Sequence, residues 1–346
     1  MTIYSRIPEF NKILTDLDLA DQAIDAEELR FLSQHLTRHA IADVQVDTIL
    51  SSGLFIQEMQ IQPQQKITEE FHTEGKHVRL FFYLNGDSHV QFGAGNMDYK
   101  HEVGMIQRNF LNTDGAGGLV HILKNQKLNY IVIKFSYAFY LSLLKHEQWI
   151  EGDPFHQYVL SGDAENRPNE TFFIDSRIIN ILRDIMNASS VQFQKTAFVH
   201  MKLKELLFML YQISLSGRTD QRLKTPIALL EKVRSYILLN LDNPPSMEVL
   251  QLKYELNPKV FMLDFKKYFG KTIYAFVIQE RMAKAQRLLQ EDYNVNELAT
   301  NLGYQSVSHF IKVFKSYYGY TPKKAILRLR NQEVLENQSL AAYPVG

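Results

Sequence analysis

The chain has 346 residues, which is longer than a single hydrophobic core usually becomes, so two domains and a connector are expected. Hydrophobic residues make up 45% of the chain and charged residues 22%, ordinary globular values that argue against disorder. The absence of cysteine excludes disulfides, thiolate nucleophiles and cysteine-based zinc or iron–sulfur sites. Any metal would need histidine and carboxylate ligands.

The sequence contains no signal for membrane insertion or export. No stretch approaches the roughly 18 to 20 uninterrupted apolar residues that a membrane helix needs. The first residues, MTIYSRIPEFNK, lack the apolar run of a signal peptide. These features predict a cytoplasmic protein without a membrane partner.

The formal net charge is zero, but the charges are unevenly distributed along the chain. Residues 226–330 hold 16 Lys and Arg against 9 Asp and Glu, and the remainder holds 22 basic and 29 acidic residues. A basic C-terminal module joined to an acidic N-terminal one is expected of a DNA reader with a separate sensing or pairing domain.

The segment from about residue 54 to residue 134 has the pattern of short β-strands. Its apolar runs are LFIQEMQIQP, HVRLFFYLNG, HVQFGAG and NYIVIKF, separated by Gly, Asn, Asp and Pro. Several such runs predict a barrel or a sandwich. The GAGG run at residues 115–118 lacks the following Lys-Ser/Thr or helix start that a phosphate site needs, and it is predicted to be a loop.

Helical patterns flank this β region. Residues 25–39 (DAEELRFLSQHLTRH) are predicted to form a helix with Asp25 as its N-cap. After Ser136 the runs AFYLSLLKHEQWI, DSRIINILRDIM and KTAFVHMKLKELLFMLYQIS have helical periodicity. The last run is long and amphipathic, so residues 196–214 are expected to pack on a neighbour and to support a homodimer.

The polar segment SGRTDQRLKTP at residues 216–226 is predicted to link two domains, and the tail after residue 330 is expected to fray. The predicted organisation is a β-rich sensing or dimerisation domain (1–160), a helical connector and linker (161–225), a DNA-binding domain (226–330) and a flexible tail (331–346).

Two segments of the basic region repeat each other at a constant offset of 49 residues, and such repeats are settled before any single motif. The first reads SMEVLQLKYELNPKVFMLDFKKYFGKT (246–272) and the second VNELATNLGYQSVSHFIKVFKSYYGYT (295–321). Each contains a short helix, a tight turn and a second helix with a glycine cap, the order of a helix-turn-helix unit. The identities pair Phe265, Lys266, Tyr268, Gly270 and Thr272 with Phe314, Lys315, Tyr317, Gly319 and Thr321.

The second copy has each feature of a helix-turn-helix unit. Gly303 can take the positive φ of the turn, and Ser306 is placed to cap the recognition helix. Phe310, Val313 and Phe314 are expected to face inward. On the opposite face, small polar side chains near the helix start can reach base edges and lysines can neutralise phosphates. The predicted DNA-binding residues are Ser306, Ser308, His309, Lys312 and Lys315.

Residues 272–290 (TIYAFVIQERMAKAQRLLQ) lie between the copies and have the apolar spacing of one continuous helix. Such a rod would fix the separation of the two units. If both recognition helices enter one face of a duplex, they are expected about one helical turn, roughly 34 to 36 Å, apart.

The segments RMAKAQRLL (281–289), VNELATNLGYQSVSHFIKVFKSYYGYTP (295–322) and FKKYFG in the first copy together resemble the DNA-binding domain of the AraC/XylS family of transcription regulators. The resemblance covers about residues 227–324. It implies a C-terminal all-α domain of about seven helices with two helix-turn-helix units. Family members commonly carry a cupin-like β-barrel ahead of this domain, so the expected fold class is α+β.

The first copy departs from the family pattern. Gln251 and Glu255 stand where the family usually has Ala and often Gly, and Leu263 stands where many members place Arg. Leu and Met cannot donate the bidentate hydrogen bonds that identify a guanine. We therefore expect the second unit to carry more of the base readout, with the lysines of the first unit contacting phosphates. The predicted DNA-binding residues of the first unit are Asn257, Lys259, Met262, Leu263, Lys266 and Lys267.

Structural roles compete with functional ones at several positions. Arg281 is expected to anchor the linker helix rather than contact DNA, whereas His309 stays open between a DNA contact and a packing role. Trp149 is expected to fill the core rather than line a ligand pocket. The aromatic residues predicted to be core rather than base-stacking are Phe265, Phe314, Tyr268 and Tyr317.

Histidines in the N-terminal half invite a metal-site interpretation. Their spacing includes no His-x-His pair and no i, i+4 pair flanking a carboxylate. No metal, cofactor or catalytic residue is therefore predicted. The histidines concerned are His72, His77, His89, His101 and His121.

The leading hypothesis is a sequence-specific DNA-binding regulator, an activator, whose N-terminal domain binds a small effector or mediates dimerisation. Its expected partners are promoter DNA, a second copy of the chain, RNA polymerase and a small effector. Two alternatives stay open: an effector-independent regulator with a purely structural N-terminal domain, and a cupin-type enzyme fused to a DNA-binding module. The leading hypothesis is not an enzyme, and its effector-binding residues are unassigned.

Overall fold

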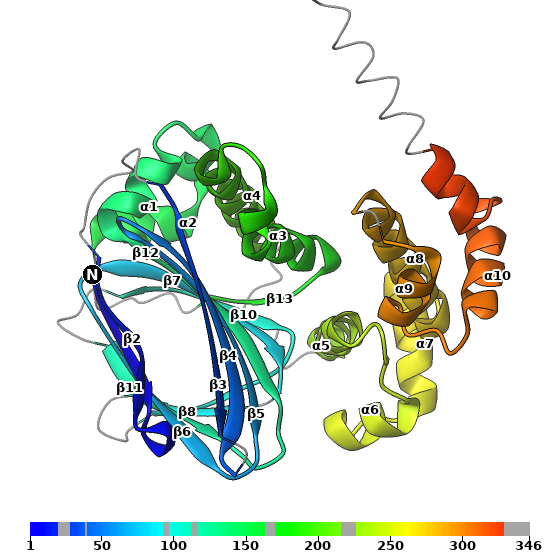
Figure 1. Ribbon diagram of the computed structural model, residues 1–346, viewed down its shortest axis with the longest axis horizontal. Helices are drawn as coiled ribbons and strands as arrows, with labels where there is room; N and C mark the ends of the chain where they lie inside the picture. The colour runs from blue at the N-terminus through cyan, green and yellow to red at the C-terminus, as the bar shows by residue number, and fades with distance from the viewer. Residues whose placement is uncertain are drawn as a thin grey trace, which may run out of the picture. The chain divides into compact units, whose positions relative to one another are not determined.

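A computed structural model describes residues 1–19, 28–38, 40–86, 88–92, 97–111, 116–162, 170–215, 226–291 and 293–328 (Figure 1). The chain divides into two compact units, Met1–Ser235 and Tyr236–Gly346, each of which is treated by itself below. Residues 216–225 of the predicted linker, the tail after residue 330 and Asp25 lie outside the described residues.

The first unit is built on two antiparallel sheets. The strands of the six-stranded sheet, in pairing order, are β2 (Lys12–Asp18), β1 (Thr2–Ile7), β6 (Ile67–Glu74), β11 (Ala116–Ile122), β8 (Ser88–Phe92) and β9 (Met97–His101). The strands of the seven-stranded sheet are β13 (Glu170–Phe173), β10 (Met105–Leu111), β7 (His77–Asn85), β12 (Leu128–Ser136), β5 (Leu54–Pro63), β4 (Ala42–Ser51) and β3 (Arg30–Arg38).

The strand pattern confirms the predicted β region and extends it toward the N-terminus. The four apolar runs form β5, β7, β8 and β12. The described strands lie in two separate sheets, so a closed, cupin-like barrel is not confirmed. What the structure shows is a sheet-rich N-terminal region followed by a helical C-terminal one.

The helix predicted at residues 25–39 is wrong, because residues 30–38 form strand β3. This strand pairs with β4 along its whole length, from Arg30 opposite Leu50 to Arg38 opposite Ala42. Helix propensity is a weak preference that tertiary pairing overrides. The acidic residues before Arg30 gave the segment the appearance of a helix start, although its partner strand decides its structure.

The loop predicted at residues 115–118 is also wrong, because Gly117 and Gly118 belong to β11. They pair with His72 and Phe71 of β6. A Cβ atom at Gly117 would lie 2.8 Å from Nδ1 of His72, so the glycine permits a close approach of the two strands. Glycine therefore marks tight strand packing at this position.

In the part of the N-terminal unit that the structure describes, four α-helices accompany the sheets, and Figure 1 shows them gathered beside β7 and β12. Their positions confirm the three predicted helical runs. In the last of them, Leu203, Leu206, Leu207 and Leu210 are buried, as expected of an amphipathic helix. The helices are α1 (Tyr137–Leu144), α2 (Pro154–Ser161), α3 (Ser176–Met186) and α4 (Lys195–Leu215).

The second unit is helical, and α5 (Pro226–Leu239) spans the boundary between the two units. Residues 322–328 are also helical, which agrees with the expected number of about seven helices in this region. The remaining helices are α6 (Met247–Tyr254), α7 (Pro258–Phe269), α8 (Ile273–Gln290), α9 (Val295–Asn301) and α10 (Val307–Tyr318).

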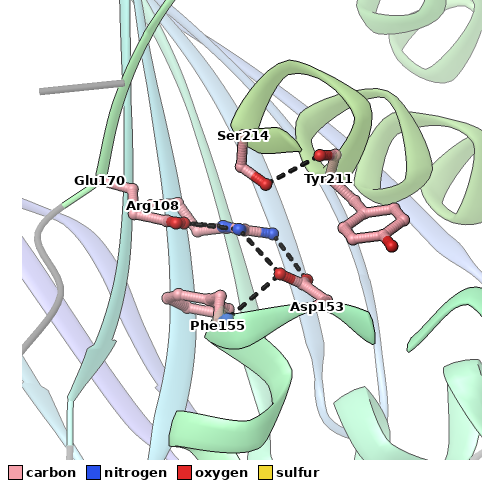
Figure 2. Close-up of polar contacts among 6 residues, drawn as sticks. All are labelled: Arg108, Asp153, Phe155, Glu170, Tyr211 and Ser214. Atoms are coloured by element: carbon pink, nitrogen blue, oxygen red, sulfur yellow. Dashed lines mark hydrogen bonds and ion pairs between the residues drawn. The ribbon is translucent and has the colours of Figure 1, made fainter. Parts of the chain in front are cut away.

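A buried ion cluster joins three elements of the first unit (Figure 2). Arg108 on β10 is fully buried, and its Nε donates to Oε2 of Glu170 on β13 at 2.6 Å. Its Nη1 donates to Oδ2 of Asp153 at 3.1 Å, and Oδ1 of Asp153 caps α2 by accepting from the Phe155 backbone N–H. The guanidinium also lies 4.2 Å from the ring centre of Phe155. One cation thus compensates Asp153, which is fully buried, and Glu170, which is partly buried.

Replacing Arg108 by Met should destabilise the N-terminal compact unit by about 3–5 kcal/mol, because it leaves the buried Asp153 without its counter-charge. Arg177→Met is the matched control: Arg177 pairs with Asp175 at the surface, and its loss should cost at most about 1 kcal/mol. Urea unfolding followed by circular dichroism measures both. Equal costs for the two variants would contradict a structural role of the Arg108 cluster.

Candidate nucleic-acid interface

Side-chain caps define both helices of the second predicted helix-turn-helix unit, residues 295–321. Asn294 accepts from the backbone N–H of Asn296 and of Glu297, and Glu297 accepts from that of Asn294, which makes a complete capping box at the start of α9. Ser306 Oγ accepts from the His309 backbone N–H at 3.2 Å and begins α10. The predicted cap at Ser306 is therefore confirmed.

Helix α10 has one buried face and one exposed face. Phe310 and Phe314 are fully buried and belong to a core cluster with Leu298 and Leu302, while Val313 packs at its edge. Burial of these aromatic rings fixes the rotation of α10 about its axis. The residues predicted to contact DNA are all exposed: Ser306, Ser308, His309, Lys312 and Lys315.

The turn between α9 and α10 requires glycine. Gly303 has a φ of +72°, and a Cβ atom there would lie 1.5 Å from the carbonyl oxygen of Asp242. No side chain fits at that distance. The turn of the second helix-turn-helix unit therefore packs directly against the backbone that follows α5.

Arg281 on α8 links the same backbone to the second helix-turn-helix unit. Its Nε donates to the Leu241 carbonyl at 2.9 Å and its Nη2 to the Asp242 carbonyl at 3.2 Å. The guanidinium also lies 5.0 Å from the ring centre of Tyr304, in the α9–α10 turn. The predicted anchoring role of Arg281 is confirmed by these contacts.

Helix α8 is continuous from Ile273 to Gln290, as predicted for the linker helix, and its later turns pack in the core of the second helix-turn-helix unit. Lys284 Nζ donates to the Asn301 carbonyl at the end of α9, and the Tyr318 hydroxyl on α10 donates to the Met282 carbonyl. Burial raises the pKa of Tyr318 to about 12, so this hydroxyl stays protonated and able to donate near neutral pH.

The first helix-turn-helix unit, residues 246–272, has the same plan as the second but a different turn. Ser246 caps α6, and Asn257 caps α7 by accepting from the backbone N–H groups of Lys259 and Val260. Glu255 ends α6 with a φ of +52°, a left-handed conformation that usually selects glycine. Phe261 and Phe265 supply the buried face of α7.

The exposed face of α7 is more apolar than that of α10. Met262 is 48% exposed and Leu263 is 62% exposed, whereas Leu263 corresponds, at the offset of 49 residues, to Lys312 of α10. Apolar side chains can contact the methyl group of thymine but donate no hydrogen bond to a base. The predicted first-unit lysines, Lys259, Lys266 and Lys267, are exposed on the same helix.

Two of the aromatic residues predicted to be core are not. Phe265 and Phe314 are fully buried, but Tyr268 is 37% exposed and Tyr317 is 48% exposed. The next residue of each helix takes the inward position: Phe269 lies 4.6 Å from Phe265, and Tyr318 lies 4.8 Å from Phe314, between ring centres. A spacing of four rather than three residues thus keeps the side chain on the buried face.

Two exposed lysines that were not among the predicted DNA-binding residues, Lys323 and Lys324, lie at the start of the last described helix. The Thr321 hydroxyl accepts from the Lys324 backbone N–H and caps this helix, as Thr272 caps α8. Positive side chains at a capped helix start, where free N–H groups also point outward, suit a phosphate. The TPKK sequence after the second copy was the available signal.

The N-terminal histidines are placed separately where the structure describes them. His72 pairs with Glu74, the Nδ1–H of His77 donates to the Gly75 carbonyl oxygen, and His121 contacts the Thr68 hydroxyl. Burial lowers the pKa of His77 to about 3. The side chains of His89 and His101 are outside the described residues, and no group of three potential metal ligands occurs among those described.

Trp149 belongs to an aromatic cluster against α4, where its ring centre lies 5.5 Å from those of Phe208 and Tyr211. Its indole N–H donates to Glu147. This environment agrees with a packing role. None of the helices that the structure describes is long and apolar enough to cross a membrane.

Comparison with known proteins agrees with this geometry. A family model described as a helix-turn-helix domain matches residues 253–328. The regulatory protein PocR of Salmonella typhimurium is 35% identical over 95 residues, which are 27% of this chain and 31% of PocR. The C-terminal unit contains an AraC-type helix-turn-helix domain.

Two further relatives of the AraC-type domain differ in how much of the chain they match. The transcriptional activator PerA of Escherichia coli O127:H6 is 27% identical over 189 residues, covering 47% of this chain and 69% of PerA. The DNA-binding domain of AdpA, solved with a target DNA, is 26% identical and covers 30% of this chain and 94% of that domain, with a TM-score of 0.28. This chain spans under a third of PocR and 20% of the activator Btr of Bacillus subtilis.

Replacing Gly303 by Ala should destabilise the AraC-type domain by at least about 3 kcal/mol, because left-handed strain adds to a collision with the Asp242 carbonyl. Gly319→Ala is the control: its φ is +78°, but nothing lies within 4 Å of the added Cβ, so only about 1–2 kcal/mol of strain is expected. Thermal and urea unfolding compare the variants. A Gly303→Ala protein as stable as the Gly319→Ala protein would show that the close approach is absent in solution.

Proposed function

We propose that this protein is a sequence-specific DNA-binding transcription regulator. The observation that carries the proposal is the exposed polar and basic face of α10, presented by an AraC-type domain whose turn, caps and buried aromatic face fix its orientation. Promoter DNA is the partner, and the cytoplasm is where the protein would meet it. No enzymatic activity belongs to this proposal.

The second helix-turn-helix unit supplies most of the base readout in this proposal. Ser306, Ser308 and His309 lie at the start of α10, the part of a recognition helix that usually reaches base edges. Lys312 and Lys315 follow on the same exposed face and neutralise phosphates. His309 is exposed and also packs edge-on against Tyr304, so both of its considered roles are compatible with its position.

The first helix-turn-helix unit positions the protein on the duplex in this proposal. Its lysines bind phosphates, and Met262 and Leu263 make apolar contacts in the groove. The Asn257 side chain is occupied by the α7 cap, so it orders the helix start close to the DNA. With α8 as a rigid spacer, the two recognition helices would enter successive major grooves, roughly 34 to 36 Å apart.

The sheet-rich unit is proposed to regulate the DNA-binding unit by binding a small effector or by forming a homodimer. Helix α4 buries its leucines within its own unit but leaves Met201 and Phe208 exposed, which supplies apolar surface for a second copy. Activation, through contact with RNA polymerase, is favoured because PerA and Btr are named as activators.

Lys312→Ala should weaken binding to a selected DNA site and reduce the slope of log affinity against log salt by about 1, because one phosphate contact is lost. Lys66→Ala, at an exposed lysine of the sheet-rich unit, should change neither quantity. Fluorescence anisotropy between low and physiological salt measures both. A wild-type protein that prefers no selected fragment over bulk DNA would contradict the proposed function itself.

Ser308→Ala should broaden the base preference in one half of the DNA motif, because a group at the start of α10 that can hydrogen-bond to a base is lost. Leu263→Ala, at the exposed apolar position of α7, should lower affinity with little change in the selected motif. Selection from a random DNA pool, repeated with each variant, measures both. A motif that depends more on Leu263 than on Ser308 would assign base readout to the first unit instead.

A further inference from the structure

The first recognition helix, α7, exposes apolar side chains at the positions where a DNA-reading helix meets base edges. Val260 is 54% exposed, Met262 is 48% exposed and Leu263 is 62% exposed. A single exposed apolar residue needs no explanation, but three within four residues of one helix form a patch that a partner is expected to cover. The positions of α10 that correspond to them, at the offset of 49 residues, are His309, Ile311 and Lys312.

Lysines stand at both ends of this apolar patch. Lys259, Met262, Leu263 and Lys266 follow each other at the spacing i, i+3, i+4, i+7, so they form one exposed stripe on the side of α7 away from its buried aromatic rings. The two lysines are separated by about 10.5 Å along the helix axis, at 1.5 Å per residue. This length is close to the width of the major groove, which is roughly 12 Å.

The stripe matches the major groove of DNA in both charge and polarity. Phosphates line the two edges of the groove, and the apolar group that base edges present inside it is the C5-methyl group of thymine. Helix α7 carries three lysines and one carboxylate, that of the half-buried Asp264, so its exposed face is cationic. Over a guanine or a cytosine, Met262 and Leu263 would leave hydrogen-bonding groups of the base without partners. An apolar stripe between two cations therefore fits best over thymine.

We propose that α7 selects a thymine-rich half-site by burying C5-methyl groups against Val260, Met262 and Leu263, while Lys259 and Lys266 hold the flanking phosphates. The inference rests on the proposed function and names the base that the first helix-turn-helix unit reads. Each buried methyl group contributes a preference of about fourfold. A good bidentate hydrogen-bonded pair discriminates more strongly, so the second helix-turn-helix unit keeps most of the base readout.

The preference is shared among three side chains, so truncating one of them leaves most of it in place. Alanine at position 263 still offers an apolar contact to a thymine methyl group. Leu263→Ala therefore lowers affinity without changing which base is preferred. A test of the proposal has to remove the methyl group from the DNA, or replace the apolar side chains by polar ones.

Deoxyuridine in place of thymidine tests the proposal on the wild-type protein, because uracil keeps the pairing groups of thymine and lacks only the methyl group. A site selected from a random DNA pool is prepared with uracil in one half at a time, and binding of the full chain is measured by fluorescence anisotropy. Uracil in the half-site of α7 should weaken binding by about fourfold for each methyl group contacted. Uracil in the half-site of α10 should leave the affinity nearly unchanged, because Ser308 and His309 read hydrogen-bonding groups that uracil retains.

A double variant, Met262→Gln with Leu263→Asn, tests whether α7 makes these contacts. Its amide side chains are similar in size to the originals and gain nothing from a methyl group, so its affinities for the thymine and uracil forms should be nearly equal. The half-site whose uracil response disappears in this variant is the one that α7 contacts. Leu252→Asn is the matched control: Leu252 is 83% exposed on α6, outside the stripe, and this variant should keep the full uracil response of the wild type.

Methylated cytosine provides a test in the opposite direction. Cytosine in place of a contacted thymine should weaken wild-type binding, and 5-methylcytosine at the same position should recover about fourfold, because it carries the same methyl group at the same place. The double variant should show no such recovery. Equal binding of cytosine and 5-methylcytosine by the wild type would show that the pairing groups set the preference, which overturns the proposal.

The remaining outcomes separate this inference from the proposed function. A specifically bound site that tolerates uracil in both halves would overturn the thymine proposal, keep the proposed function and leave the apolar stripe to a protein partner. An equal uracil penalty in the wild type and the double variant would overturn the role of α7. A wild-type protein that prefers no DNA fragment would overturn both proposals. Circular dichroism establishes that the double variant folds, and if it does not, Leu263→Asn alone should lose part of the uracil response.

Discussion

The close approach of Gly303 to the Asp242 carbonyl is the constraint on which the geometry of the AraC-type domain depends. The turn of the second helix-turn-helix unit packs on this backbone, so residue 303 cannot carry a side chain. Arg281 binds the carbonyls of Leu241 and Asp242 and lies against Tyr304, which brings the end of α5, the spacer α8 and the second turn to one point. This junction positions the turn before α10, and burial of Phe310 and Phe314 sets the rotation of the helix, so contacts within the protein fix the direction of its exposed face.

The two helix-turn-helix units share their interior and differ in their exteriors. Phe265 and Phe314 are buried at equivalent positions, and Gly270 and Gly319 end both recognition helices in the left-handed conformation. The exposed position occupied by Leu263 in one unit is Lys312 in the other. Packing therefore preserves the scaffold in both units while the surfaces follow separate demands. Two units with the same fold and different surfaces are expected to make different contacts, because function depends on the surface residues and not on the fold.

Sequence reasoning was accurate where one helix generates its own pattern and weaker where a distant segment decides. The cap at Ser306 and the continuity of α8 follow from local spacing, and the structure contains them. Strand β3 was mistaken for a helix because its own residues have helical spacing, while its structure is decided by pairing with β4, the strand that follows it. The exposed Tyr317 shows the limit within a helix: a shift of one residue, to Tyr318, selects the buried ring. The Arg108 cluster had no sequence signal, because its charges meet only when β10, β13 and the start of α2 are assembled.

The N-terminal compact unit, Met1–Ser235, stabilises its buried cations in two different ways. Arg108 lies between the carboxylates of Asp153 and Glu170 and against the rings of Phe155 and Phe172, so its charge is balanced by ion pairs. Lys134 is also buried, but its Nζ donates to a neutral group, the Thr73 hydroxyl. Burial lowers the pKa of Lys134 to about 7, because a hydrogen bond to a neutral oxygen stabilises the charged form less than a carboxylate does. The same unit therefore keeps one buried cation charged by pairing it with acids and leaves the other able to lose its proton near neutral pH.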